Sequence, residues 1–149
     1  MADTSLNENR LALLIWQTSN LWQSKVRHRL RDSGITLNEY LILETIYLLQ
    51  QRNINITQRD ICKNASIDRS VVSLRVSKLE EKKLISKKQP QDKRSDSLIL
   101  TSAGNYLIDN IVDLENELFN KLGSEIFNFT NSLKLLLGKK IRIRAKLND

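Results

Sequence analysis

The sequence is poor in residues that break helices or cross-link a chain: its 149 residues include four glycines, one proline and one cysteine. Because glycine and proline mark turns and loops, their scarcity predicts long helices rather than a sandwich of short strands. A single cysteine excludes a disulfide within the chain. Apolar runs are far shorter than the ~20 residues that cross a bilayer. The N-terminal MADTSLNENR lacks the basic start and apolar block of a signal peptide, so we expect a cytoplasmic protein.

The residues from which enzymes and metal centres are built are also scarce. There is one histidine, no glycine-rich phosphate loop and no recognisable pair of catalytic carboxylates, so nothing assembles a reaction site. His28 lies in a basic run without neighbours that could complete a metal site. Cys62 adjoins Ile61 in a short predicted helix and fits a small buried apolar residue better than a redox sensor. We expect no enzyme, no metal and no cofactor.

The positive charge is concentrated in one part of the chain. The formal net charge is +7, and residues 63–94 alone carry 10 basic and 4 acidic side chains, a net of +6. A cluster of this kind is the electrostatic footprint of a protein that binds the phosphate backbone of nucleic acid. The alternative is a solvated basic surface that only keeps the protein soluble.

The N-terminal third predicts two helices, each opened by a capping box. Ser5-x-x-Glu8 begins a helix that runs to about Asp32, and its N-terminal half is apolar on all sides. Such a helix is usually covered on both sides, so we expect a partner subunit to supply the second cover. Thr36-x-x-Glu39 begins the second helix. The residues expected on its inner face are Leu37, Tyr40, Leu41, Glu44, Ile46 and Leu48.

Residues 57–101 predict two helices joined by a turn, followed by a β-hairpin. TQRD (57–60) caps a short helix, NAS (64–66) forms the turn, and Ser66 caps a second helix over residues 67–83. Val72, Val76 and Leu79 form its buried stripe, whereas small polar side chains on the opposite face would let it approach base edges closely. The segments 84–89 and 97–101 read as two strands joined by a basic tip. The combination is a winged helix-turn-helix.

The rest of the chain predicts two further helices. Thr101 caps the first of them, and Gly123-Ser124 separates it from the last, which ends in the basic segment KKIRIRAK (139–146). The expected fold class is therefore mainly α with a small β-hairpin wing, in which the winged helix-turn-helix is flanked by N- and C-terminal helices.

Three segments carry a family resemblance. SVVSLRVSKLEEKKLI (70–85) has the form of a recognition helix with its exit, and DKRSDSLILTSAG (92–104) that of a wing, D-x-R followed by L-x-L-T-x-x-G. ITLNEYLILETI (35–46) has the form of the opening of a second helix. Together they resemble the MarR family of bacterial transcription regulators. One departure is Lys83, which stands where the family usually has glycine, so this helix exit has to use a non-glycine residue.

The resemblance implies one MarR-like chain over residues 1–149 that forms a homodimer, with residues 36–101 as the DNA-binding domain and residues 1–33 with 102–149 as the dimerisation region. The helix over 67–83 would enter the major groove and the wing, 90–96, the minor groove of a pseudo-palindromic operator in double-stranded DNA. The DNA-binding candidates are Thr57, Gln58, Ser66, Asp68, Arg69, Ser70, Ser73, Leu74, Arg75, Ser77, Lys78, Lys88, Lys93 and Arg94. Arg94 is the expected minor-groove residue. The dimer-interface candidates are Leu11, Leu14, Ile15, Leu118, Ile126, Phe129, Leu133, Leu136 and Leu137.

For the biological role, we expect a repressor that occludes a promoter and is released by a small aromatic or anionic effector. The candidates for an effector pocket are Trp16, Arg27, His28, Tyr40 and Tyr47. The aromatic members would serve equally well to pack helices. Two alternatives stay open: a global regulator that competes with nucleoid proteins and needs no effector, and a winged helix used as a protein-interaction module. The charge of residues 63–94 speaks against the second alternative.

Overall fold

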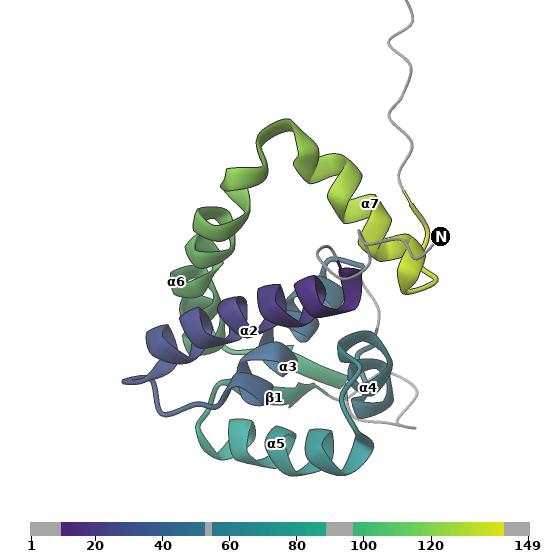
Figure 1. The fold of residues 1–149 in the computed structure, drawn as a ribbon. Coiled ribbons are helices and arrows are strands. Elements are labelled where there is room, and N and C mark those ends of the chain that lie inside the picture. The colour runs from purple at the N-terminus through teal and green to yellow at the C-terminus, as the bar shows by residue number, and fades with distance from the viewer. Residues whose placement is uncertain (1–9, 53–54, 89–96, 142–149) are drawn as a thin grey trace, which may run out of the picture. The chain divides into compact units, whose positions relative to one another are not determined.

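The computed structural model describes residues 10–52, 55–88 and 97–141, and these fall into two compact units, 1–114 and 115–149. The helices and strands, in chain order, are α2 (Leu11–Leu30), α3 (Leu37–Gln50), α4 (Gln58–Ala65), α5 (Arg69–Glu81), β1 (Ile85–Lys88), β2 (Ser97–Leu100), α6 (Ser102–Phe119), a 3-10 helix (Asn120–Glu125) and α7 (Ile126–Leu136) (Figure 1). The prediction of a mainly helical fold with one antiparallel hairpin is confirmed.

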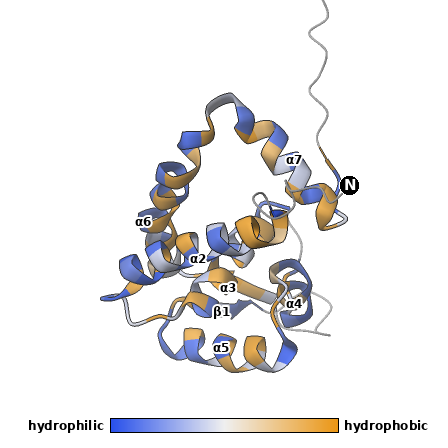
Figure 2. Cartoon of the chain, viewed as in Figure 1, coloured by the Kyte–Doolittle hydropathy of each residue, from blue (hydrophilic) through white to orange (hydrophobic). Residues whose placement is uncertain are grey.

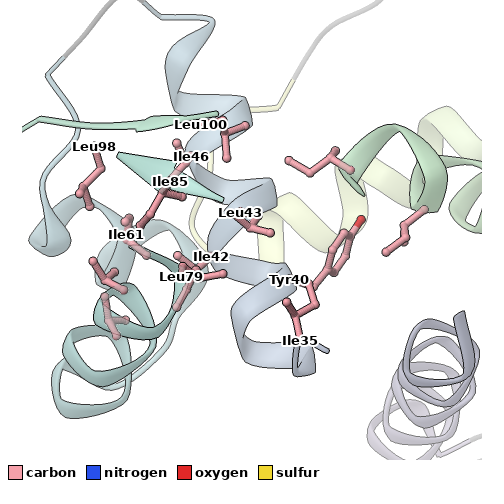
Figure 3. Packing of buried hydrophobic residues seen from close by; sticks show 14 of the residues in the cluster. Ile35, Tyr40, Ile42, Leu43, Ile46, Ile61, Leu79, Ile85, Leu98 and Leu100 are labelled. Atoms are coloured by element: carbon pink, nitrogen blue, oxygen red, sulfur yellow. The ribbon is translucent and has the colours of Figure 1, made fainter. Parts of the chain in front are cut away.

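Helix α3 is the central element of the first unit, in contact with α2, α4, α5 and β2. It begins with the predicted capping box: Thr36 Oγ1 accepts the Glu39 N–H at 3.2 Å, and Glu39 Oε1 accepts the Thr36 N–H at 3.1 Å. Ile42, Leu43 and Ile46 are fully buried and lie among the apolar side chains of the neighbouring elements (Figure 3). The helix therefore forms the apolar core on which the other elements of this unit pack.

The prediction of which α3 residues face the core was only partly right. Tyr40 and Ile46 are buried as expected, but Leu48 is exposed, and Ile42 and Leu43 were overlooked. Leu37, Leu41 and Glu44 are half-buried. Apolar residues surround most of α3, so periodicity alone does not select the side that faces the core.

Helices α4 and α5 form the expected helix-turn-helix, with different boundaries. Thr57 caps α4 through a complete capping box with Asp60. Ser66 does not cap α5 as predicted: it ends α4 in a left-handed conformation, with φ +54°. A capping residue at a helix start needs an extended backbone, and Asp68 occupies that position before Arg69. The predicted helix over 67–83 is thus shorter, although Val72, Val76 and Leu79 are fully buried as expected.

The exit from α5 is a Schellman motif built on a non-glycine residue. The Leu84 N–H donates to the Leu79 carbonyl and the Lys83 N–H to the Glu80 carbonyl, each at 3.0 Å. Lys83 adopts φ +59°. The expectation that this exit has to use a residue other than glycine is confirmed.

The hairpin pairs β1 with β2 in antiparallel register, with Ile85 opposite Leu100 and Lys88 opposite Ser97. The base of the hairpin is tied to α3 and to the segment after it. The Gln50 side-chain oxygen accepts the Leu100 N–H at 2.8 Å, and the Ile56 carbonyl accepts the Leu98 N–H at 2.8 Å. The tip, residues 89–96, lies outside the described residues, as does the Ser5-x-x-Glu8 capping box.

The start of α6 explains the glycine of the wing signature. Thr101 Oγ1 accepts the Gly104 N–H at 3.2 Å, as expected of a helix cap, and donates to the Lys83 carbonyl at 2.7 Å. A Cβ atom at position 104 would collide with the Leu84 carbonyl oxygen. Glycine is therefore required where α6 passes the exit of α5.

In the second unit, Gly123 interrupts the helical path with φ +54°, and α7 follows. No residue of α7 is buried. Among the residues that the structure describes, no helix has both the length and the apolarity needed to cross a membrane.

Candidate nucleic-acid interface

The outward face of α5 is formed by small hydroxyl side chains with one leucine. Ser70, Ser73 and Ser77 are exposed, and Leu74 is 54% exposed. Ser77 Oγ donates to the Ser73 carbonyl at 3.2 Å, which leaves its lone pairs available outside the helix. This face has the size of side chain and the mixture of donors and acceptors that contact with base edges requires.

Basic side chains border this face on the flank of α5 and on β1. Lys78 Nζ lies 3.8 Å from Glu81 Oε2, and Lys87 Nζ lies 3.9 Å from Glu80 Oε1. These exposed pairs are long and weak. The Lys78 ammonium group thus stays accessible to phosphate, and Lys87 and Lys88 are exposed on β1.

A buried carboxylate joins the start of α3 to the end of α5. Glu39 is 0% exposed. The Lys82 ammonium donates to its two oxygens at 3.1 and 2.9 Å, and to the Gly34 carbonyl at 2.7 Å. Arg75 Nη1 lies 3.9 Å from Glu39 Oε1. A buried charge needs a partner of opposite sign, and Glu39 has two.

Sequence reasoning missed this cluster. Glu39 was recognised only as a capping residue, and Arg75 only as a DNA contact. The two cations come from a helix some 40 positions further along the chain, so no local pattern links them to Glu39. The sequence did contain one indication: Glu39 is an acidic residue on a mostly apolar helix. If such a residue is buried, it requires a cation from another part of the chain.

The other candidates around the turn are either hydrogen-bonded within the helix start, half-buried or exposed. Thr57 is half-buried, and its hydroxyl both accepts the Asp60 N–H and donates to Asp60 Oδ2. Gln58 is half-buried at the start of α4, whereas Ser66, Asp68 and Arg69 are exposed. Lys93 and Arg94 lie outside the described residues. The structure thus brings the candidates of α5 to one surface and leaves the wing contacts as predictions.

Comparison with known proteins agrees with this arrangement of elements. A sequence profile described as the MarR family matches residues 33–95, from the turn before α3 through the hairpin tip. Residues 33–95, which contain the helix-turn-helix and β1, therefore match the MarR family, and the chain resembles a transcription regulator rather than an enzyme.

Individual MarR-like proteins show the extent of the similarity. An uncharacterised HTH-type transcriptional regulator of Bacillus subtilis, YdcH, is 29% identical over 128 residues, which span 83% of this chain and 87% of YdcH. The crystal structure of the Staphylococcus aureus MepR–DNA complex matches with a TM-score of 0.73 and 25% identity, over 89% of this chain and 97% of MepR. The operator complex of a mutant of Escherichia coli MarR matches with a TM-score of 0.64 and 20% identity, over 92% and 97% of the two chains.

The five candidates for an effector pocket have different surroundings. Tyr40 is buried in the core, whereas Trp16 and Tyr47 are exposed. On the exposed part of α2, Arg27 donates to the Gln23 side chain at 3.2 Å, and the Arg31 guanidinium lies 2.9 Å from His28 Nδ1. An open hollow of about 320 Å³ at the C-terminal end of α2 is lined by Arg29, Leu30, Ser33, Leu107, Asn110 and Ile111, and by none of the five.

The candidates for the dimer interface are mostly uncovered in the single chain. Leu11, Leu14 and Ile15 are exposed at the apolar N-terminal end of α2 (Figure 2). In the second unit, the exposed candidates are Ile126, Phe129, Leu136 and Leu137, while Leu133 is half-buried. Leu118 differs from the others because it is already buried within the chain. Several of these residues line a groove of about 290 Å³ between the end of α6 and α7.

The surroundings of Cys62 and His28 give no support for redox or metal chemistry among the described residues. Cys62 is a free, half-buried thiol packed against the apolar core. Within residues 10–52, 55–88 and 97–141, no group of three or more histidine, cysteine, aspartate or glutamate side chains is placed to hold a metal ion.

Proposed function

We propose that this protein acts in the cytoplasm as a homodimeric repressor that places α5 in the major groove and its wing in the minor groove of a pseudo-palindromic operator. The observation that carries the proposal is the exposed serine face of α5, bordered by basic side chains in the segment that supplies +6 of the net charge. An α-helix fits the major groove, and clustered lysine and arginine neutralise phosphates. MepR, which resembles this chain along almost its full length, has been solved on DNA.

The wing contact can be tested by changing Arg94 to alanine. We expect Arg94→Ala to weaken operator binding at least tenfold, because a guanidinium is well suited to the narrow, strongly negative minor groove of A·T-rich DNA. The measurement is a mobility-shift titration with random and A·T-rich palindromic duplexes at two salt concentrations. Arg10→Ala is the charge-matched control outside the basic segment and should bind as the wild type does. Equal affinities for the two variants would remove the wing from the mechanism.

Release by a small molecule is the second part of the proposal. MepR, at 25% identity, has also been solved bound to ethidium bromide. In this chain, Trp16 and Tyr47 offer exposed aromatic surface on α2 and α3. A ligand that binds one spacing of the two recognition helices better than another would shift the dimer away from DNA. Titrating ethidium fluorescence with the protein alone tests this without DNA, into which ethidium itself intercalates. An unchanged fluorescence would favour a regulator that needs no effector.

A further inference from the structure

Arg75 is a surplus cation beside the buried carboxylate of Glu39. Lys82 already neutralises Glu39 through hydrogen bonds to both carboxylate oxygens, and the Thr36 N–H supplies a further donor. The 3.9 Å separation between Arg75 Nη1 and Glu39 Oε1 exceeds hydrogen-bond distance. Arg75 Nε is buried and has no hydrogen-bond partner among the described residues. Arg75 is therefore held to Glu39 only by a long ion pair without a hydrogen bond, whereas Lys82 makes the close contacts.

The position of Arg75 makes its charge available at the DNA-facing helix. Arg75, Lys78 and Lys82 recur along α5 at spacings of three and four residues and therefore share one flank. The Arg75 side chain is 32% exposed, and exposed Leu74 is its neighbour. The Arg75 guanidinium thus lies at the border between the buried carboxylate and the surface that α5 presents to a ligand.

We propose that Glu39 and Lys82 are positioning residues that decide whether Arg75 can bind a DNA phosphate. Lys82 neutralises Glu39, and this leaves the Arg75 guanidinium free to turn outward. Without Lys82, the buried carboxylate would draw Arg75 inward, because an uncompensated buried charge is costly and a full ion pair would relieve it. This inference rests on the proposed contact of α5 with DNA, and it adds that a residue of α3 that touches no DNA controls one phosphate contact.

The test measures DNA affinity against salt concentration for three variants, with a random-sequence duplex about three helical turns long as the probe. Each phosphate contact contributes about 0.9 to the slope of log affinity against log salt. Lys82→Met should lower the magnitude of the slope by about 1 and the affinity at low salt by about tenfold. Glu39→Gln should keep the wild-type slope, since glutamine still accepts the Thr36 N–H and Arg75 stays free.

The double variant Glu39→Gln/Lys82→Met is the decisive measurement. It contains no buried carboxylate to attract Arg75, so its slope should return to the wild-type value. If the double variant binds as weakly as Lys82→Met, Lys82 itself contacts DNA and the proposal is overturned. Because the double variant buries no unpaired charge, it keeps the test informative even if Lys82→Met does not fold.

The same series separates this inference from the proposed function. A wild-type protein that does not bind the duplex overturns both. If the wild type binds with a steep salt dependence and Lys82→Met binds identically, only the role of Glu39 and Lys82 is overturned. As a further check, Arg75→Met should lose one unit of slope in the wild type and nothing more in the Lys82→Met background.

Discussion

At the scale of single residues, the exit of α5 lowers stability. Lys83 stands there in place of the glycine that is usual in the MarR family. Lys83 occupies a left-handed conformation, with φ +59°, in which a side chain crowds the backbone. A residue other than glycine in this region costs on the order of 1–3 kcal/mol. The Schellman hydrogen bonds of Lys83 and Leu84 hold the conformation in place. The strained position lies between the recognition helix and the wing, so the turn is maintained by its neighbours.

Replacing Lys83 with glycine should therefore stabilise the protein. We expect Lys83→Gly to raise the free energy of unfolding by about 1 kcal/mol, since the relief of the left-handed backbone exceeds the added entropy of the unfolded chain. Denaturant unfolding measures the change. Glu81→Gly, two residues earlier in regular helix, is the matched control and should lower stability by about 1 kcal/mol. A loss of stability in both variants would contradict the argument.

Predictions for single residues were right where the interacting residues are close together in the sequence. The capping boxes at Thr36 and Thr57 could be read directly, because donor and acceptor lie within one turn. The assignment of Ser66 as a helix start was wrong, because a serine can also end a helix in the left-handed region. The cations beside Glu39 could not be predicted, because which distant side chains meet a buried carboxylate is decided by packing between helices.

At the scale of elements, the hairpin depends on α3 as much as on its own strand pairing. A two-stranded hairpin is marginal by itself in water. Here β2 carries buried Leu98 and Leu100 into the core, and its outer edge is bonded to Gln50 and Ile56. The sequence predicted the two strands from their composition. It contained no sign of these edge bonds, since Gln50 belongs to a different element.

Removing the Gln50 acceptor should loosen the base of the wing. In Gln50→Leu the Leu100 N–H loses its partner, and a buried unpaired donor costs about 1–3 kcal/mol. We therefore expect the free energy of unfolding to fall by about 1–2 kcal/mol. Gln51→Leu, an exposed neighbour, should change it by less than about 0.5 kcal/mol. Hydrogen exchange provides a direct readout, because the Leu100 amide should lose protection only in Gln50→Leu. Equal protection in both variants would show that the Gln50 contact is dispensable.

At the scale of the whole molecule, two apolar surfaces remain uncovered, one in each unit. The N-terminal half of α2 exposes Leu11, Leu14, Ile15 and Trp16, and α7 buries none of its residues in the single chain. Contiguous exposed apolar residues of this kind mark interaction sites in proteins that are otherwise well packed. The all-round apolar pattern of α2 had predicted a second cover, and in the described first unit only Val26 and Leu30 of that helix are buried. We take a second copy of the chain as that cover, in keeping with the proposed homodimer.

A charge placed in this surface should therefore separate the subunits. Ile15 is 47% exposed in the single chain, so Ile15→Glu costs little in a monomer but would bury an unpaired carboxylate in a dimer. We expect sedimentation to show a monomer, and operator affinity to fall by a hundredfold or more because the two half-sites are no longer bound by one molecule. Leu74→Glu is the matched control, a similarly exposed apolar residue on α5. It should remain a dimer and lose DNA affinity through charge repulsion alone, so a dimeric Ile15→Glu variant would mean that α2 does not form the interface.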